Sequence, residues 1–158
     1  MLCSVYGIII NGMITDGKEE HIMNLFYLLK PKTTVAYLNK AHTIRQGLEK
    51  MKAHGYSAIP VIDDNGEYIG TVSEGDFLWH MLESDMSDQR ALEKYCIIDI
   101  VNEERNRPVR TNVTMDELLL RVMDQNFVPV IDDRNIFIGI VTRKDVIRYF
   151  YNKDRIAP

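Results

Sequence analysis

Cysteine is scarce in this chain of 158 residues, which contains only Cys3 and Cys96. Two thiols cannot supply the disulfide framework of a small secreted domain, and these two form no C-x-x-C pair. The simplest interpretation is a pair of free thiols in a reducing compartment, so we expect a cytoplasmic protein. The histidines show neither H-E-x-x-H nor another ligand-like spacing, and no metal site is predicted. They are His21, His42, His54 and His80.

Long apolar segments and basic stretches are missing as well. The apolar stretch at residues 5–10 is far shorter than the roughly 20 residues that cross a membrane, and no basic residue precedes it. Neither a membrane span nor a signal peptide is therefore expected. The net charge of -4 and the pI near 5.6 argue against a nucleic acid as the main partner. The chain also lacks a P-loop and a nucleophile elbow, so no catalytic residue and no enzymatic activity are predicted.

What the sequence does contain is an internal repeat. Residues 70–76 (Gly-Thr-Val-Ser-Glu-Gly-Asp) return 69 positions later as residues 139–145 (Gly-Ile-Val-Thr-Arg-Lys-Asp), and the Pro-Val-Ile-Asp-Asp that precedes them recurs at the same shift. Between 58–79 and 127–148, nine of 22 positions are identical. Such a density at one offset indicates a duplicated unit. A unit of roughly sixty residues buries too little surface to be stable alone, so the two copies are expected to pack together.

The first copy, residues 24–82, predicts the order strand, helix, strand, strand, helix. Thr43 and Gln46 have the spacing of a capping box, in which each side chain satisfies a backbone N–H, and Gly55 suits the end of that helix. Asn65-Gly66 favours a primed hairpin turn between the last two strands. The predicted strands are residues 33–38, 58–62 (with Pro60 at its start or edge) and 68–72, and the second helix follows Ser73 and reaches about Leu82.

The second copy, residues 97–151, repeats this order. It has its own capping box at Thr114 and Glu117, and its opening residues, 97–101, mirror residues 26–29 of the first copy. Its strands are predicted at 108–110, 127–131 and 136–141, and its last helix at about 144–151. The flanking segments are a charged linker at 83–96 with a helical piece near Ser87, a tail at 152–158, and an N-terminal extension of unknown role at 1–22, in which Asn11-Gly12 suits a hairpin turn.

The doubled pattern of Pro-Val-Ile-Asp-Asp and Gly-h-Val-Ser/Thr-x-x-Asp, each within such a five-element unit, resembles a tandem CBS-domain pair (a Bateman module). This family is named after cystathionine β-synthase, and the resemblance covers about residues 24–151. It implies an α+β fold in which two repeats, each with a three-stranded sheet, pack sheet to sheet about a pseudo-two-fold axis. It also implies two clefts that bind an adenosine-containing ligand: AMP, ADP, ATP, S-adenosylmethionine or cyclic di-AMP.

The resemblance further implies a set of nucleotide-binding residues. Asp76 and Asp145 would accept hydrogen bonds from ribose hydroxyls, while Ser73 and Thr142 would donate to a phosphate at a helix N-terminus, where free N–H groups favour an anion. Arg143 would add a forked, charge-assisted contact. The base is expected among strand residues, namely Val35, Ala36, Tyr56, Ala58 and Pro60 on one side and Val109, Val128 and Pro129 on the other.

The two clefts should differ in chemistry. From the capping threonine to the strand proline there are seventeen residues in the first copy and fifteen in the second, so Gly55–Ala58 has no full counterpart. Arg143 and Lys144 flank the motif of the second copy, whereas Glu74 and Gly75 occupy those places in the first. Because a carboxylate beside a phosphate is unfavourable, we expect the firmer phosphate contact near Thr142.

Structural interpretations of the same residues stay open. The Ser-x-x-Asp and Thr-x-x-Asp motifs are also helix-capping pairs in form, and a cap alone is worth roughly 1 kcal/mol. The paired aspartates at 63–64 and 132–133 permit acid–base or metal chemistry, but their position between two strands favours turn residues. Arg105, Arg107 and Arg110 are candidates either for contacts to a diphosphate or for a solvated surface.

We therefore predict a regulatory, non-catalytic module that binds an adenine nucleotide, requires no cofactor and signals through a conformational change. The helical stretches 77–82 and 146–151 are apolar around most of their circumference, which indicates covering by a second subunit and hence a homodimer. An unidentified protein partner would respond to the change, and neither a nucleic acid nor a membrane is an expected partner. The alternative function is a dimerisation scaffold that binds no ligand.

Overall fold

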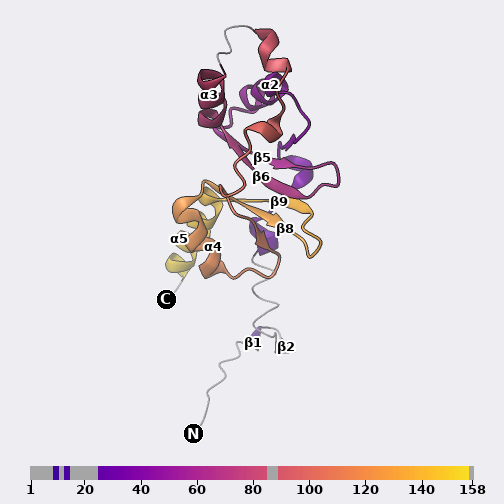
Figure 1. The fold of residues 1–158 in the computed structure, drawn as a ribbon. Helices are drawn as coiled ribbons and strands as arrows, with labels where there is room; N and C mark the ends of the chain where they lie inside the picture. The colour runs from indigo at the N-terminus through magenta and orange to yellow at the C-terminus, as the bar shows by residue number, and fades with distance from the viewer. Residues whose placement is uncertain (1–8, 11–12, 15–24, 85–88, 157–158) are drawn as a thin grey trace.

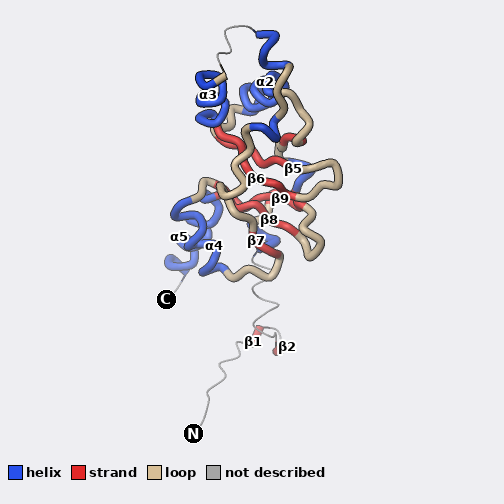
Figure 2. Tube along the Cα trace, viewed as in Figure 1, coloured by secondary structure: helices blue, strands red, loops and turns tan. Residues whose placement is uncertain are grey.

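The computed structural model describes residues 9–10, 13–14, 25–84 and 89–156. Each repeat forms a sheet with two helices, and the two sheets face each other in the middle of the molecule (Figure 1). The helices lie at the outer ends, so the layers run helices, sheet, sheet, helices (Figure 2). The predicted α+β fold of two repeats packed sheet to sheet is confirmed.

Both sheets are built on the same strand order. In each, a short strand pairs in parallel with a central strand, which pairs antiparallel with the strand that follows it. The strands of the first repeat are β4 (Leu38–Asn39), β5 (Ala58–Ile62) and β6 (Tyr68–Ser73), and those of the second are β7 (Val109–Arg110), β8 (Phe127–Ile131) and β9 (Phe137–Thr142).

Local capping chemistry sets the ends of the helices. Helix α2 (Ile44–His54) begins at the predicted capping box, in which Thr43 accepts a hydrogen bond from the Gln46 N–H and the Gln46 side chain accepts one from the Thr43 N–H. It ends at Gly55, whose φ of 64° lies in the left-handed region that glycine enters at little steric cost. The remaining helices are α3 (Glu74–Glu83), α4 (Met115–Asp124), which starts at the other predicted capping box, and α5 (Arg143–Ile156).

The opening segment of each repeat crosses over to the other repeat. Strand β3 (Lys30–Pro31) pairs antiparallel with β9, which gives the second sheet a fourth strand where three were predicted. Conversely, Asn102 forms a bridge with Thr71 of β6. The short 3-10 helix η3 (Ile97–Asp99), predicted to open the second repeat, buries Ile97 in the core of the first.

Three hydrophobic clusters follow from this crossover. Two of them lie under the helices, one in each repeat, and each includes residues that cross over from the other repeat. Leu25 and Leu28 of the first repeat, for example, pack in the cluster of the second. The third cluster lies between the two sheets and joins the repeats; it contains Val35, Ile62, Phe127, Phe137 and Ile140. Burial of these side chains from both repeats supports the prediction that neither half is stable alone.

The strand predicted at residues 33–38 is wrong for most of its length. Lys32–Thr34 forms a 3-10 helix (η1), in which the Thr34 hydroxyl donates to the Pro31 carbonyl, and only Leu38 of the predicted stretch lies in a strand. The chain turns here from the sheet of the second repeat to its own sheet. The β-branched composition of the stretch carries no information about that change of partner.

The primed turn predicted at Asn65-Gly66 is also wrong. A type I′ turn needs positive φ at both central residues, and of these two only Gly66 has it, at 86°. Asp63 instead organises the turn, because its carboxylate accepts backbone N–H groups of the following residues. The second hairpin repeats this arrangement with Asp132 and with Asn135 at φ 66°. The turn role of the paired aspartates is thus confirmed.

Pro60 lies inside the central strand β5 rather than at a strand start or sheet edge. The opposite residue, Thr71, bonds to Asn102 through both its N–H and its C=O, so these groups point away from β5. The Pro60 nitrogen therefore faces away from β6, on the side where β4 reaches only as far as Val61. No ladder hydrogen bond is lost, which explains how a central strand tolerates proline.

The remaining boundaries differ less from prediction. Helix α5 continues past residue 151 into the predicted tail. The linker contains the 3-10 helix η2 (Gln89–Glu93), while Ser87 lies outside the described residues. Near the N-terminus, β1 (Ile9–Ile10) pairs antiparallel with β2 (Met13–Ile14), and the turn predicted between them also lies outside the described residues.

Candidate functional site

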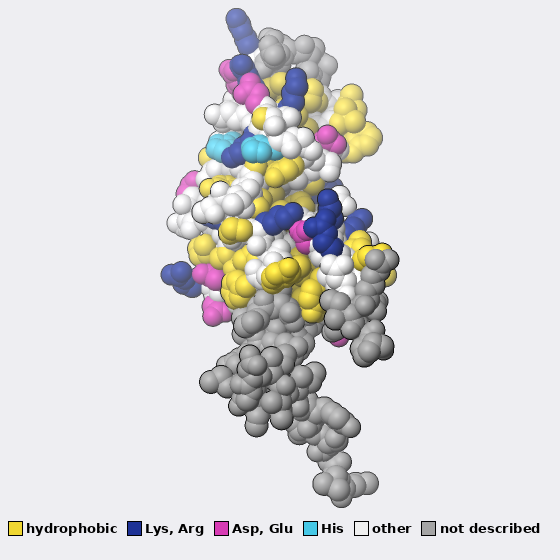
Figure 3. Space-filling model, turned by 180° about the vertical axis from the view of Figure 1, so that it is seen from behind, with side chains coloured by type: hydrophobic (Ala, Val, Ile, Leu, Met, Phe, Trp, Pro, Cys, Tyr) yellow, Lys and Arg dark blue, Asp and Glu magenta, His cyan; other side chains and the backbone are white. Residues whose placement is uncertain are grey.

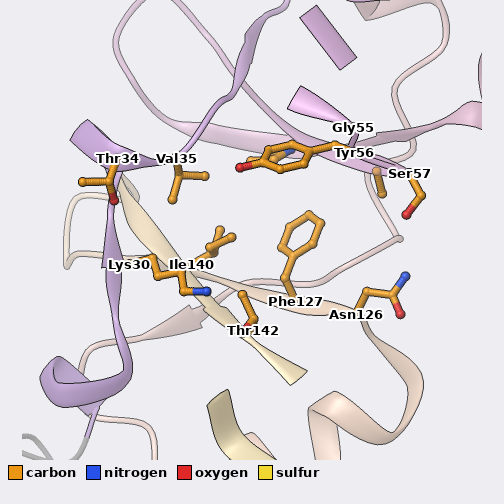
Figure 4. A pocket seen from close by; sticks show the side chains of 12 residues that line it. Lys30, Thr34, Val35, Gly55, Tyr56, Ser57, Asn126, Phe127, Ile140 and Thr142 are labelled. Atoms are coloured by element: carbon orange, nitrogen blue, oxygen red, sulfur yellow. The ribbon is translucent and has the colours of Figure 1, made fainter. Parts of the chain in front are cut away.

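A pocket of about 300 Å³ lies between the two repeats (Figure 4). Its walls combine apolar and small side chains of the first repeat with side chains of β8 and β9 from the second. The lining residues are Lys30, Thr34, Val35, Gly55, Tyr56, Ser57, Ala58, Pro60, Asn126, Phe127, Ile140 and Thr142. Of the predicted base-binding residues, Val35, Tyr56, Ala58 and Pro60 thus meet in one pocket, together with the predicted phosphate-binding Thr142.

The end of α2 places Tyr56 over the pocket. Gly55 terminates the helix in a left-handed conformation, and the Tyr56 N–H donates to the carbonyl of Met51. The Tyr56 ring packs against His54 at 5.5 Å between ring centroids and remains half-buried. In Figure 4 the rings of Tyr56 and Phe127 stand on opposite walls of the pocket. An apolar slot between two rings suits a flat aromatic ligand.

The polar end of the pocket is built at the start of α5. The Thr142 hydroxyl donates to the Asp145 carboxylate at 2.5 Å and accepts from the Asp145 N–H at 3.3 Å. Lys30, from the crossing strand β3, forms an ion pair with the same carboxylate at 3.0 Å. Burial alone would raise the pKa of Asp145, but the hydrogen bonds from Thr142 and Lys30 and the nearby positive charges outweigh it and lower the pKa. The carboxylate is therefore ionised at neutral pH.

A second, wider hollow adjoins this polar end. It is lined by Asn126 and Thr142, which it shares with the pocket, and by side chains of α5: Arg143, Lys144, Ile147, Arg148 and Tyr151. Arg143 is anchored by a hydrogen bond from its Nε to the Gln125 carbonyl. Figure 3 shows Lys and Arg side chains gathered beside hydrophobic ones at mid-height of the molecule. Three cationic residues at a helix N-terminus form a favourable environment for phosphate.

The corresponding motif of the first repeat is occupied by the chain itself. The Asp76 carboxylate accepts the N–H and the hydroxyl of Ser73 at 2.7 and 2.8 Å, which is the capping arrangement. Arg105 forms an ion pair with Asp76 and also donates to the Ser73 hydroxyl at 2.8 Å. The hollow that remains there is open and includes the carboxylates of Glu74 and Asp124. Both capping carboxylates are thus paired with a cation of the chain itself, but only Arg105 also donates to the capping hydroxyl.

Four predicted base-binding residues line neither the pocket beside Thr142 nor the hollow beside Ser73. Ala36 packs in the core of the first repeat, and Val128 lies in the core of the second with no exposed surface. Val109 is also buried in that core and borders a different hollow, beside α4. Pro129 is on the same face of β8 as Phe127 but lines neither the pocket nor the hollow beside Ser73. For Val128 the physical reason is the alternation of faces along a strand: in β8, Phe127 faces the pocket, so its neighbour Val128 must face the helices.

Two important lining residues were missed by sequence reasoning. Lys30 comes from the crossing segment of the first repeat, whereas Phe127 lies in the same repeat as Thr142 and pairs with it across the sheet. The duplicated pattern did offer a signal for Phe127, since it occupies the position of Ala58 in the second copy. Nothing in the sequence marks Lys30, because its role depends on the pairing of β3 with β9.

The three arginines considered for a diphosphate have separate partners. Arg105 pairs with Asp76, Arg107 with Glu104, and Arg110 with the Asp132 carbonyl. Within the described ranges, no group of three or more His, Cys, Asp or Glu side chains is arranged to hold a metal ion. In the same part of the chain, no helix is both long and apolar enough to span a membrane.

Comparison with known proteins places this geometry in a family. The sequence model of the family described as CBS domain matches two stretches, residues 29–83 and 100–152. The chain belongs to the CBS-domain family. The two matched stretches are the two repeats whose sheets enclose the pocket, and the resemblance inferred from the doubled motif is confirmed.

Among CBS-pair proteins, the chain is similar to cyclic di-AMP receptor B of Bacillus subtilis (strain 168), with 29% identity over 119 residues, or 72% of this chain and 77% of the receptor. Among solved structures, it is similar to CbpB in complex with c-di-AMP, with a TM-score of 0.73, 24% identity and coverage of 87% and 94%. CBSX2 in complex with AMP gives a TM-score of 0.65 at 22% identity, with coverage of 81% and 96%. At these identities the structural likeness concerns the fold.

A more distant relative is an enzyme. L-aspartate semialdehyde sulfurtransferase of Methanocaldococcus jannaschii is 22% identical over 113 residues, but the chain spans only 20% of its length. The similarity therefore concerns a CBS-sized portion of that protein, whereas the receptor is matched over most of its length.

Proposed function

We propose that this chain is a regulatory module that binds an adenine nucleotide in the pocket between its repeats. The observation that carries the proposal is the meeting, in one pocket, of the apolar Tyr56–Ala58 wall from the first repeat with Thr142 from the second. Its volume of about 300 Å³ lies at the lower end of the range of roughly 300–1,000 Å³ that is usual for small-molecule sites.

In this proposal the adenine lies between Tyr56 and Phe127. Both rings offer a flat apolar surface, and base–aromatic stacking contributes about 1–3 kcal/mol per base. The small side chain of Ala58 leaves room beside them, and Val35 and Ile140 complete the apolar lining. A purine is better suited to this slot than a flexible chain because it loses little conformational freedom on binding.

The ribose and phosphate are assigned to the polar end. Asp145 has an ionised carboxylate that accepts from Thr142 and Lys30, and a ribose hydroxyl offers an equivalent donor. On binding, Lys30 would exchange the carboxylate for a ligand phosphate, so its charge would remain paired. The phosphate would then lie toward Arg143 and the hollow beside α5, where the start of the helix favours an anion.

The relatives support a nucleotide ligand and suggest two candidates. The receptor from Bacillus subtilis is named for cyclic di-AMP, and the structure of CBSX2 was solved with AMP. A cyclic dinucleotide would place one base in the pocket and extend its phosphodiesters over Arg143 and Arg148. ADP, ATP and S-adenosylmethionine share the adenosine group and belong in the same test.

Isothermal titration calorimetry of the full chain with these five ligands tests the proposal. We expect saturable binding of at least one of them. Tyr56→Leu should weaken that binding about tenfold through the loss of stacking, since about 1.4 kcal/mol corresponds to a factor of ten. Tyr56→Phe keeps the ring and serves as the matched control with nearly unchanged affinity. Absence of heat with all five ligands would favour the alternative function, a dimerisation scaffold.

We further propose that the module acts as a homodimer. Large apolar side chains are exposed on two helices, with Leu78, Trp79 and Leu82 on α3 and Ile147 and Tyr151 on α5. Each is more than half exposed in the single chain, which indicates that another surface covers them. Because α3 and α5 are equivalent in the two repeats, a second copy of the chain can bury both in a closed two-fold contact.

Oligomeric state measured by sedimentation tests the dimer. Trp79→Glu places a charge in the proposed interface and should convert the dimer to monomer, whereas Lys52→Glu on the exposed side of α2 should leave it dimeric. A wild-type chain that sediments as a monomer at micromolar concentration would refute the dimer without affecting the nucleotide site.

Ligand binding would signal by changing the angle between repeats, since the pocket is bounded by both. Such signalling requires a different affinity in the two arrangements, and a protein partner would respond to the change. The module itself is proposed to be non-catalytic and cytoplasmic, an environment that suits the free thiol of Cys96. Release of phosphate from ATP that is lost in Asp145→Ala would contradict the non-catalytic proposal.

A further inference from the structure

The strand registers show which residues of the two clefts are equivalent. Leu38 pairs with Val61 in the first sheet, and Val109 pairs with Val130 in the second. Val35 stands three residues before Leu38, and Asn106 stands three residues before Val109. The two are therefore equivalent under the pseudo-two-fold symmetry. The same comparison of β5 and β8 makes Ala58 equivalent to Phe127.

These equivalent positions differ in the hydrogen bonds that their side chains can form. The first cleft is the pocket that ends at Thr142, and it is lined by Val35 and Ala58; the second cleft is the hollow beside Ser73. In the second, Asn106 is buried, and its side-chain Nδ2 donates to the carbonyl of Phe127 at 2.6 Å. The backbone of Asn106 has a φ of 54°, a left-handed conformation that asparagine adopts more readily than most residues.

Asn106 donates to the carbonyl of Phe127, and the equivalent residue, Ala58, lines the pocket. The pair Pro60–Thr71 is not hydrogen-bonded, because Thr71 directs its N–H and C=O to Asn102. Hydrogen-bonded and non-hydrogen-bonded pairs alternate along an antiparallel ladder. The pair Ala58–Ser73, two residues from Pro60–Thr71, is therefore also not hydrogen-bonded, and the Ala58 carbonyl points away from β6. In the second repeat, the equivalent carbonyl of Phe127 receives the Asn106 amide instead.

The neighbouring side chain occupies the polar end of the second cleft. Arg105 forms an ion pair with Asp76 and donates to Ser73, the counterparts of Asp145 and Thr142. The Asp76 side chain keeps only 15% of its surface exposed, and Arg105 keeps 36%. Asp76, the acceptor for a ribose hydroxyl, and Ser73, the donor to a phosphate, are therefore already bonded to the chain itself.

Tyr68 fixes this segment in place. Its hydroxyl donates to the Asn106 carbonyl at 2.8 Å and lies 2.8 Å from the hydroxyl of the fully buried Thr71. The equivalent residue of the second repeat is Phe137, which has no hydroxyl. The segment beside the first cleft thus lacks the anchor that holds Arg105 and Asn106 in the second.

We propose that Arg105 and Asn106 are built-in occupants of the second cleft, and that the chain binds one nucleotide, in the first cleft only. The internal contact stands independently of any ligand, whereas the count of one nucleotide rests on the proposed function. The carboxylates of Glu74 and Asp124 around the remaining hollow add to this, since they repel a phosphate.

A double-mutant cycle in thermal unfolding, without ligand, tests the internal contact. Asp76→Ala removes the helix cap and the partner of Arg105, whereas Arg105→Ala removes only the contact. We expect the double variant to melt at nearly the temperature of Asp76→Ala alone. A melting temperature lowered by the sum of the two single effects overturns the proposal, because the residues would then act independently.

Calorimetric stoichiometry with AMP and with ATP as probes tests the count. The wild-type chain should bind one nucleotide, and the variant Arg105→Ala/Asn106→Gly should bind two, with Arg107→Ala as the matched control at one. Two nucleotides on the wild type overturn the proposal. A count that stays at one in the double variant assigns the block to Phe127 and overturns the role of Arg105 and Asn106. If neither probe binds, the count is made with whichever of the five ligands does; a wild type that binds none of them refutes the proposed nucleotide function instead, and the unfolding cycle then decides the internal contact.

Discussion

The two clefts are made by the same duplicated unit, yet their polar ends are bonded differently: Lys30 pairs with Asp145 in one, whereas in the other Arg105 pairs with Asp76 and also donates to Ser73. Tyr56, Val35 and Ala58 leave a pocket in the first, where the second has Gln125, Asn106 and Phe127 at the equivalent positions. Strand order, register and helix caps are shared by both repeats. The comparison teaches that a duplicated fold keeps its backbone geometry while a few side chains give its two clefts different linings and hydrogen bonds.

Glycines at the crossover provide the strongest test of the shared geometry. A Cβ added at Gly139 would overlap the carbonyl oxygen of Lys30, and one at Gly70 would stand 2.7 Å from the carbonyl oxygen of Asn102. Overpacking usually costs about 1–3 kcal/mol, and backbone atoms cannot move aside. Gly139→Ala should therefore lower the free energy of unfolding by an amount near the top of this range, and Gly70→Ala should lower it by less. Chemical denaturation checks both, and Gly75→Ala, with no contact closer than 3.6 Å, is the control.

The next largest effect concerns nucleotide affinity. Asp145→Ala should weaken binding about 10–100-fold, since a hydrogen bond to a charged group contributes about 1.5–3 kcal/mol. Asp76→Ala should change affinity by no more than about twofold, because its carboxylate is bonded to Arg105. Titration calorimetry of both variants with the ligand that binds the wild type checks this ranking. Equal losses would mean that both clefts bind nucleotide.

A smaller effect distinguishes the anchors of the two crossing segments. Tyr68→Phe makes the first repeat resemble the second, where Phe137 stands at this position, and removes a buried hydroxyl that bonds to Thr71 and Asn106. Denaturant unfolding should show a loss of about 1 kcal/mol. Tyr27→Phe is the control, because its ring is 84% exposed and should have almost no effect. A loss no greater than that of the control would leave Tyr68 without an anchoring role.

The smallest effect should be the same in both repeats. Burial, the largest influence at Asp63, would raise its pKa, but hydrogen bonds from backbone N–H groups outweigh it and lower the pKa; at Asp132 such hydrogen bonds are the largest influence and likewise outweigh burial to lower the pKa. A carboxyl whose pKa is lower in the folded state than in the unfolded state adds stability to the fold. This contribution is fully present when the pH is above the pKa of the unfolded state, about 3.9, and it is lost as the pH falls through the pKa of the folded state. The small stability difference between wild type and either Asp63→Asn or Asp132→Asn should therefore vanish at low pH. Thermal unfolding between pH 7 and pH 2 checks this, and a difference that persists in only one repeat would show that the hairpins are not equivalent.

Much of the fold was predictable because its signals are local. The capping boxes at Thr43 and Thr114 depend on residues three apart, and both form as predicted. The crossing of β3 to β9 was not predictable, because two residues, Lys30 and Pro31, carry no pattern that names their partner strand. The 3-10 helix that replaces part of the predicted first strand is a consequence of that crossing.

The candidate site was predictable in part for the same reason. Thr142 and Tyr56 stand next to recognisable motifs, and the structure brings both to one pocket. Val128 was assigned to a cleft although it lies in the core, because the strand alternates faces and a shift of one residue reverses the assignment. The correct residue at that place, Phe127, pairs with Thr142 across the sheet and lines the same pocket.

By itself, the sequence determined that the chain is a duplicated α+β unit of the CBS type, since the repeat, the helix caps and the turn aspartates are written in short stretches. Only the tertiary structure decided how each cleft is lined and bonded, because that depends on side chains that meet from distant segments. Lys30 reaches Asp145 across 115 positions, and Arg105 reaches Asp76 from the other repeat. Such contacts follow from how the two sheets pack and from which segments cross, and no local pattern specifies either.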